Sequence, residues 1–127
     1  AEAAVEQDFL PSTISTDLHT KNLHGPVYDM PTTMTKFLHM GVPLNSVIEM
    51  STTKPAEVLG RAGEIGTLNV GTVADIAILE RHVGQFVLTD SYGQERVGEE
   101  LLTAAGTVRR GELLPGGGGL RMRKSPQ

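Results

Sequence analysis

Apolar side chains recur with a helical spacing between residues 30 and 60 of this 127-residue chain. The first such stretch predicts a helix from about Met30, with Asp29 as its N-cap and Pro31 tolerated in the first turn. Positions i, i+3, i+4 and i+7 would form its buried face, and they are Met34, Phe37, Leu38 and Gly41.

Two shorter helices are predicted next. Pro43 restarts the chain, and the following helix would bury Leu44, Val47 and Ile48. Thr53 would cap a third helix, Lys54 to Leu59, which Gly60 ends. Upstream, the residues AEAAVEQ are good helix formers with no N-cap before them, so we expect the chain to open inside a helix and to be a fragment.

A different spacing appears on either side of these helices. The β-branched run Thr13 to Thr16 suits a buried strand that ends at Asp17, and residues 18–29 predict a loop. Beyond Gly63, three runs rich in Val, Ile, Leu and Thr are separated by glycines and turn residues. They predict strands at Val73 to Leu79, Phe86 to Thr89 and Ala105 to Arg110, with a turn at residues 90–93 and another at 111–112.

These patterns divide the chain into three parts and indicate an α+β fold. Residues 1–60 hold a strand and helices, residues 61–114 form a small all-β segment, and residues 115–127 form a Gly-rich basic tail that we expect to be disordered.

Composition narrows the function classes. The chain has no cysteine, which excludes disulfides and thiolate metal sites. Its net charge is −4, and no basic cluster is interleaved with aromatic residues, so we expect no nucleic-acid partner. No apolar run is long enough to cross a bilayer, and no signal peptide is visible. We therefore predict a cytoplasmic protein with no membrane partner.

Few residues are candidates for chemistry. Asp17 follows a predicted buried strand and precedes a long loop, where α/β-barrel enzymes place catalytic groups, although aspartate at a strand end also commonly starts a turn. His19 and His24 share that loop, but two loop histidines do not make a zinc site, and surface loops often carry solvated histidines. The sequence has no His-x-His pair and no His-Glu-x-x-His helix motif.

Two stretches together resemble the end of amidohydrolase-superfamily enzymes, in particular the dihydroorotase-like amidohydrolase/deacetylase metallohydrolases. They are residues 14–60, which include the Ser-Thr-Asp step at 15–17 and Thr52-Thr53-Lys54-Pro55-Ala56, and residues 63–79, which include Gly66-Thr67-Leu68 and Gly71-Thr72-Val73-Ala74-Asp75. The resemblance implies the last strand and helices of a TIM-type (β/α)8 barrel, followed by a small β-sandwich segment. We interpret Asp75 as structural.

The same resemblance implies the site residues. Asp17 matches the aspartate that ends the last barrel strand, which is both a catalytic group and a metal ligand in the family. His19, His24 and Tyr28 would lie on the loop at the barrel mouth, near the substrate. The family holds one or two divalent metals, usually zinc, whose bound water becomes acidic enough to attack an amide or ester carbonyl. Asp17 would then take a proton as general base and return it as general acid.

The other ligands of the family, its first-strand His-x-His, its lysine and its later histidines, have no counterpart in this sequence. One carboxylate cannot supply the three or four ligands that zinc requires. We therefore expect a C-terminal fragment of a hydrolase that acts on small acylated or cyclic molecules, inactive alone and possessing no metal of its own. Two alternatives stay open: a stand-alone, non-catalytic domain that oligomerises or binds a partner, and a metalloenzyme completed by another chain. An unpartnered strand and apolar helix face favour a homo-oligomer.

Overall fold

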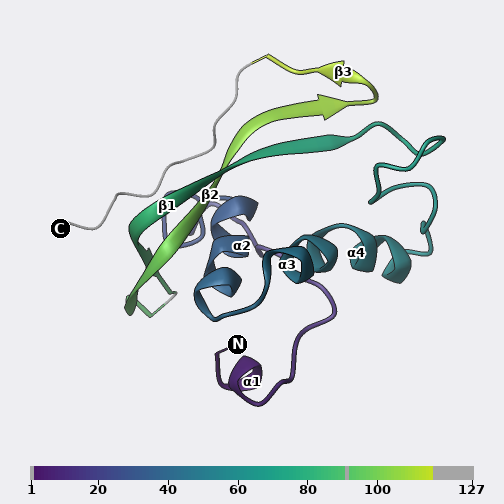
Figure 1. Ribbon diagram of the computed structural model, residues 1–127. Coiled ribbons are helices and arrows are strands. Elements are labelled where there is room, and N and C mark those ends of the chain that lie inside the picture. Colours follow the sequence, from purple (N-terminus) through teal and green to yellow (C-terminus); the bar gives the residue numbers. More distant parts are fainter. Residues whose placement is uncertain (1, 91, 116–127) are drawn as a thin grey trace.

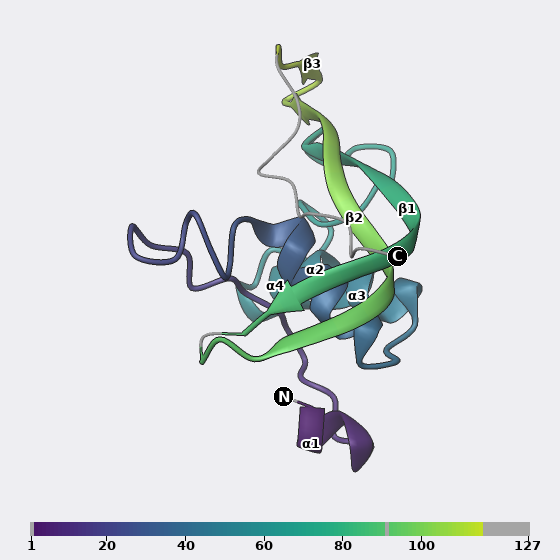
Figure 2. The same cartoon turned by 90° about the vertical axis from the view of Figure 1, so that its left-hand side faces the viewer.

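The computed structural model describes residues 2–90 and 92–115. Four helices precede a three-stranded antiparallel sheet of order β1-β2-β3 (Figure 1). The helices are α1 (Glu2–Glu6), α2 (Met30–His39), α3 (Leu44–Ser51) and α4 (Thr53–Val58), and the strands are β1 (Ile76–Thr89), β2 (Glu95–Arg109) and β3 (Glu112–Leu113). The two views show α1 at one end of the molecule and β3 at the other (Figures 1 and 2).

The predicted helices are present. Asp29 caps α2 as expected, because its Oδ1 accepts hydrogen bonds from the backbone N of Thr32 at 2.8 Å and from the Thr32 hydroxyl at 2.7 Å. The predicted cap of α4 is wrong by one residue. Thr52 precedes that helix, its side chain makes no capping bond, and Thr53 is already helical.

A single apolar cluster joins the helices to the sheet. Its buried members are Ile14, Met34, Val42, Val47, Met50 and Leu102. The predicted contributions of Met34 and Val47 are confirmed, and Phe37, Leu38 and Leu44 pack against the cluster while partly exposed. Gly41 and Ile48 were wrongly assigned to buried faces. Gly41 lies beyond the end of α2 and is exposed, and Ile48 is 36% exposed because Met50 takes the inner position on α3.

The outer edge of β2 is covered by two side chains of α2. Thr35, which is 0% exposed, accepts a hydrogen bond from the backbone N of Leu102 at 3.0 Å, and His39 Nε2 lies 2.7 Å from the carbonyl oxygen of Glu100. Because one helical turn and two strand residues span similar lengths, residues i and i+4 of α2 can reach alternate residues of β2. These contacts satisfy polar groups of a strand edge that β3 leaves unpaired.

The strand predicted at Thr13 to Thr16 does not form. This stretch is irregular, and its backbone is bonded to α3, where Ile14 N donates to Met50 O at 3.0 Å. A strand is defined by a ladder with a neighbouring strand, and the strands among the described residues pair only with one another. β-branched side chains make such a run suitable for a strand without supplying its partner.

The sheet differs from the prediction in the lengths of its strands. The expected strands at 73–79 and 86–89 belong to one strand, β1, which begins at Ile76 and continues through two irregularities in register, at Ile78/Leu79 and Val83/Phe86. The expected last strand, 105–110, is the end of the longer β2. Glycine and charged residues inside both strands concealed this length, because they resemble turn residues when only local sequence is considered.

The turn predicted at residues 90–93 is confirmed, and the turn predicted at 111–112 is wrong by one residue, because Glu112 already belongs to β3. Asp90 accepts hydrogen bonds from the backbone N of Tyr92 and of Gln94, at 2.8 and 2.9 Å, in the β1–β2 turn. Arg110 and Gly111 form the β2–β3 turn with φ values of 48° and 82°, as a two-residue type I′ turn requires. Asp75 stabilises that turn, since its Oδ1 accepts from Arg110 N at 2.8 Å, which agrees with a structural role.

The α+β arrangement is therefore present, with one sheet in the part of the chain that the structure describes. Leu102 of the β segment belongs to the same apolar cluster as the helices, so the predicted segments 1–60 and 61–114 share a core. Apart from Pro115, the predicted tail lies outside the described residues. Within residues 2–90 and 92–115, no helix has the length and apolar character needed to cross a membrane.

Candidate active site

The loop between Asp17 and Tyr28 contains the four residues singled out from the sequence: Asp17, His19, His24 and Tyr28. It connects the extended segment around Ile14 to the capped start of α2, and it consists of consecutive turns. The base of the loop is therefore anchored on both sides, by the buried Ile14 and by the Asp29 cap.

Asp17 sits at the first bend of this loop. Its φ is 51°, in the left-handed region that aspartate tolerates better than most residues, and it is exposed. The Thr16 hydroxyl accepts a hydrogen bond from Leu18 N at 3.1 Å, which closes a small turn around Asp17. The Asp17 carbonyl oxygen accepts from Asn22 Nδ2 at 3.1 Å. The backbone at Asp17 is thus held while its carboxylate faces solvent.

The structure brings His19 close to the Asp17 backbone through the same asparagine. Asn22 Oδ1 accepts from His19 N at 2.9 Å, and His19 Nδ1 accepts from Lys21 N at 3.2 Å. His24, by contrast, is exposed, and no hydrogen bond of its side chain to another described residue is recorded. The histidines therefore share the loop without forming a joint ligand set.

Tyr28 closes the other end of the loop. Its φ is 63°, and its ring lies over Gly25, where an added Cβ would come within 3.0 Å of the tyrosine hydroxyl oxygen. Gly25 itself has a φ of 135°, so two independent reasons require glycine at this position. Pro26, which follows Gly25, is held by α2, because Lys36 Nζ donates to its carbonyl oxygen at 3.1 Å.

The described donor groups are too dispersed for metal ligation. Among residues 2–90 and 92–115, no three His, Asp or Glu side chains gather closely enough to hold a metal ion. Asp17 can contribute one ligand at most, whereas a zinc site needs three or four. The described residues do not by themselves fit a metal centre.

A groove of about 280 Å³ lies beside the segment that leads to Asp17. Its lining is mainly apolar and consists of Ala4, Phe9, Pro11, Thr13, Ile14, Ser15 and Phe37. Phe9 is 74% exposed, so one wall of the groove is open to solvent.

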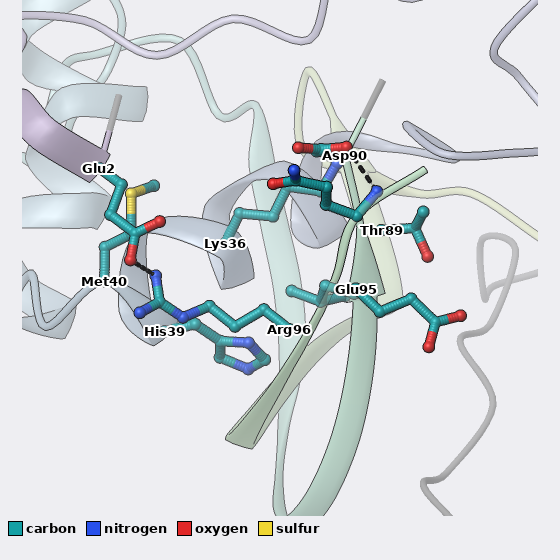
Figure 3. Close-up of a pocket in the computed structure, with 10 residues that line it drawn as sticks. Glu2, Lys36, His39, Met40, Thr89, Asp90, Glu95 and Arg96 are labelled. Atoms are coloured by element: carbon teal, nitrogen blue, oxygen red, sulfur yellow. Dashed lines mark hydrogen bonds and ion pairs between the residues drawn. The ribbon is translucent and has the colours of Figure 1, made fainter. Parts of the chain in front are cut away.

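A second cavity, of about 520 Å³, lies at the other end of α2 and is not lined by Asp17. Lys36, His39 and Met40 face residues from both ends of the β1–β2 turn, and an ion pair between Glu2 and Arg96 closes one side (Figure 3). Burial lowers the pKa of Lys36, although Asp90 opposes the shift by favouring the charged amine. The polar residues that line this cavity carry both signs of charge and indicate no particular ligand or reaction. We therefore place the candidate site at the Asp17 loop.

Sequence reasoning missed Asn22, Lys36 and His39. Asparagine in a loop is an ordinary turn former, so nothing local distinguishes Asn22. Lys36 and His39 lie on a helix whose packing partner, β2, is about sixty residues away in sequence, as the 61-residue separation of His39 and Glu100 shows.

Comparison with known proteins agrees with the resemblance noted from the motifs. The model of the amidohydrolase family matches residues 1–105. A deacetylase of Brucella anthropi is 36% identical over 126 residues, which cover 90% of this chain and 31% of that protein. A deacetylase of Enterococcus faecalis is also 36% identical, with 89% of this chain and 31% of that protein covered.

Solved structures give the same picture. One, described as an adenine deaminase, superposes with a TM-score of 0.84 at 36% identity and covers 90% of this chain. Another, described as a dihydroorotase, has a TM-score of 0.82 at 33% identity and covers 94%. In each case 31% of the other chain is matched, so this chain spans about a third of the length of these relatives.

Proposed function

We propose, from the premise that this chain belongs to the amidohydrolase family, that it supplies the proton-transferring carboxylate, Asp17, to a hydrolase that acts on amide or ester bonds. Its substrates would be small acylated or cyclic molecules, with His19, His24 and Tyr28 as their neighbours. The supporting observation is that 90% and 94% of this chain superpose on two solved structures with TM-scores above 0.8.

The chemistry asked of Asp17 is limited and well suited to its surroundings. An aspartate exposed at a loop bend can accept a proton from an attacking water and return it to the leaving nitrogen or oxygen. A held backbone keeps that carboxylate within one small region, which is what a general base requires. We also propose that residues 1–60 form the end of a barrel and that residues 61–114 form a small β-sandwich. We propose a cytoplasmic location for the protein.

Amidohydrolase-family enzymes typically use divalent metals. Since the described donors do not fit a metal centre, we propose that this chain alone neither holds zinc stoichiometrically nor turns over substrate. Metal analysis after dialysis against zinc, with assays on N-acyl and O-acyl substrates, tests this. We expect less than one zinc per chain and no turnover, and one bound zinc with turnover would refute the proposal.

The role of Asp17 is testable in a chimera. We would replace the matching third of the Brucella anthropi deacetylase with this chain and measure hydrolysis of N-acyl and O-acyl substrates. Asp17→Asn should lower kcat by about 10²–10⁴-fold, the usual contribution of a positioned acid–base group. Asp8→Asn, an exposed aspartate before the groove, is the matched control and should retain activity. Full activity of the Asp17→Asn chimera would disprove the assignment.

A second candidate function, a non-catalytic domain that oligomerises, is favoured by the exposed apolar surface. Phe9 opens the groove beside Ile14, while Val83 and Tyr92 on the hairpin are 76% and 93% exposed. Exposed apolar residues mark association sites where they join into a contiguous patch. We propose that the chain forms a homo-oligomer when isolated, and a single monomeric species in size-exclusion chromatography with light scattering, at all concentrations, would exclude it.

A further inference from the structure

Asn22 is the most connected residue of the Asp17 loop. Its side chain bridges the two residues that flank the Leu18 turn, since Oδ1 accepts from His19 N at 2.9 Å and Nδ2 donates to the Asp17 carbonyl oxygen at 3.1 Å. Its own carbonyl oxygen accepts from the backbone N of Gly25, Val27 and Tyr28, at 3.2–3.3 Å. One half-buried residue therefore joins the beginning of the loop to its end.

The orientation of the Asn22 amide is determined by its partners. A backbone N–H can only donate and a backbone carbonyl can only accept. Flipping the amide would face the NH2 group toward the His19 N–H and the oxygen toward the Asp17 carbonyl, so both bonds would be lost. The bridge consequently needs a side chain that carries one donor and one acceptor at the same reach, which asparagine supplies.

The His19 ring is a minor partner in this arrangement. Nδ1 accepts from Lys21 N at 3.2 Å, while Nε2 lies 3.3 Å from Asn22 Nδ2, which is also a donor. A neutral imidazole has one unprotonated nitrogen, so it cannot accept both bonds. The shorter bonds from Asn22 to the backbone of Asp17 and His19 must therefore carry the bridge.

We propose that Asn22 is the positioning residue for Asp17. Asp17 adopts a φ of 51°, a conformation that is sparsely populated outside glycine and persists when surrounding contacts fix it. The Asn22 bridge holds the carbonyl of Asp17 and the amide two residues later, so it fixes the 17–18 peptide plane, one of the two that flank the Cα from which the carboxylate projects. This inference rests on the proposed role of Asp17 as the acid–base group, and Asn22 acts only through it.

Two variants separate the halves of the bridge in the isolated chain. Asn22→Ala removes both bonds, whereas the isosteric Asn22→Asp keeps the acceptor for His19 N and loses the donor to Asp17. By NMR, we expect the Asp17 ¹³C′ resonance to move in both variants. Amide–water exchange at His19 should accelerate about 2–10-fold in Asn22→Ala only, the ratio that corresponds to a hydrogen bond of about 0.5–1.5 kcal/mol. Asn45→Ala, at an exposed position on α3, is the control and should change neither.

Unchanged Asp17 and His19 signals in Asn22→Ala would overturn the bridge. If Asn22→Ala unfolds, Asn22→Asp still tests the bridge. We expect its Asp17 ¹³C′ resonance to move while the His19 amide stays protected from exchange, and an unmoved Asp17 resonance would overturn the bridge. In the deacetylase chimera, Asn22→Ala should lower kcat with KM unchanged. An active Asn22→Ala chimera beside an inactive Asp17→Asn chimera would refute the positioning role alone, whereas activity in Asp17→Asn would refute the proposed function and leave the NMR test of the bridge intact.

Discussion

Replacing Thr35 by valine would remove one hydroxyl group from the junction between α2 and β2 with almost no change of shape. The Thr35 hydroxyl accepts from Leu102 N at 3.0 Å and donates to the Pro31 carbonyl oxygen at 2.7 Å, and the residue is 0% exposed. Valine leaves the buried N–H of Leu102 without a partner, which costs about 1–3 kcal/mol. The loss should appear as reduced stability, not as altered secondary structure.

Urea unfolding followed by circular dichroism measures this loss. With a slope of about 2 kcal/mol per molar urea, the midpoint should fall by about 0.5–1.5 M. Amide hydrogen exchange at Leu102 should accelerate, since its acceptor is gone. Thr107→Val, at an exposed position on the same strand, is the matched control and should stay within about 0.5 kcal/mol of the original chain.

A Thr35→Val chain with an unchanged midpoint and an unchanged Leu102 exchange rate would refute the reasoning. It would mean that α2 does not cover the β2 edge by hydrogen bonding. A loss in Thr107→Val as large as in Thr35→Val would point to a general effect of the Thr-to-Val exchange instead of the buried hydroxyl.

Three further predictions concern the same region. Gly98→Ala would place a Cβ against the His39 ring and should destabilise the chain by about 1–3 kcal/mol in urea titrations. Gly106→Ala, whose Cβ would make ordinary contacts, should cost less, and equal losses in the two variants would contradict the predicted clash with His39. Asp29→Ala should cost about 0.5–2 kcal/mol in thermal melts through loss of the α2 cap, while Asp29→Asn keeps an acceptor and should stay near the original stability. Burial lowers the folded-state pKa of Lys36, so between that pKa and 10.5 the unfolded chain binds one proton more than the folded chain. The free energy of unfolding should therefore rise with pH in this window. Lys36→Met should flatten the rise, and an identical pH profile in that variant would refute the contribution of Lys36.

The candidate site could be predicted only in part. Asp17, His19, His24 and Tyr28 were found from a motif, and the structure confirms that they share one loop, without testing their roles. Asn22 could not be found, because its importance lies in which backbone groups its amide reaches. No local pattern encodes that geometry.

Features that depend on near neighbours were determined by the sequence alone. Three such features are present: the Asp29 cap, the inward positions of Met34 and Val47, and the β1–β2 turn. Each follows from side-chain chemistry within a few residues. Family membership could also be predicted, because the ordered motifs lie within the third of its relatives' length that this chain spans.

Tertiary structure alone decided which backbone groups found partners. Thr13 to Thr16 has the composition of a strand but no neighbouring strand among the described residues, whereas β2 gained an edge partner from Thr35, 67 residues before Leu102. Strand pairing and edge coverage are contacts between distant segments, and their free energy depends on how the whole chain packs. The sequence could therefore specify the Asp17 loop, but only the packing of α2 on β2 and the bridge made by Asn22 show how that loop is held.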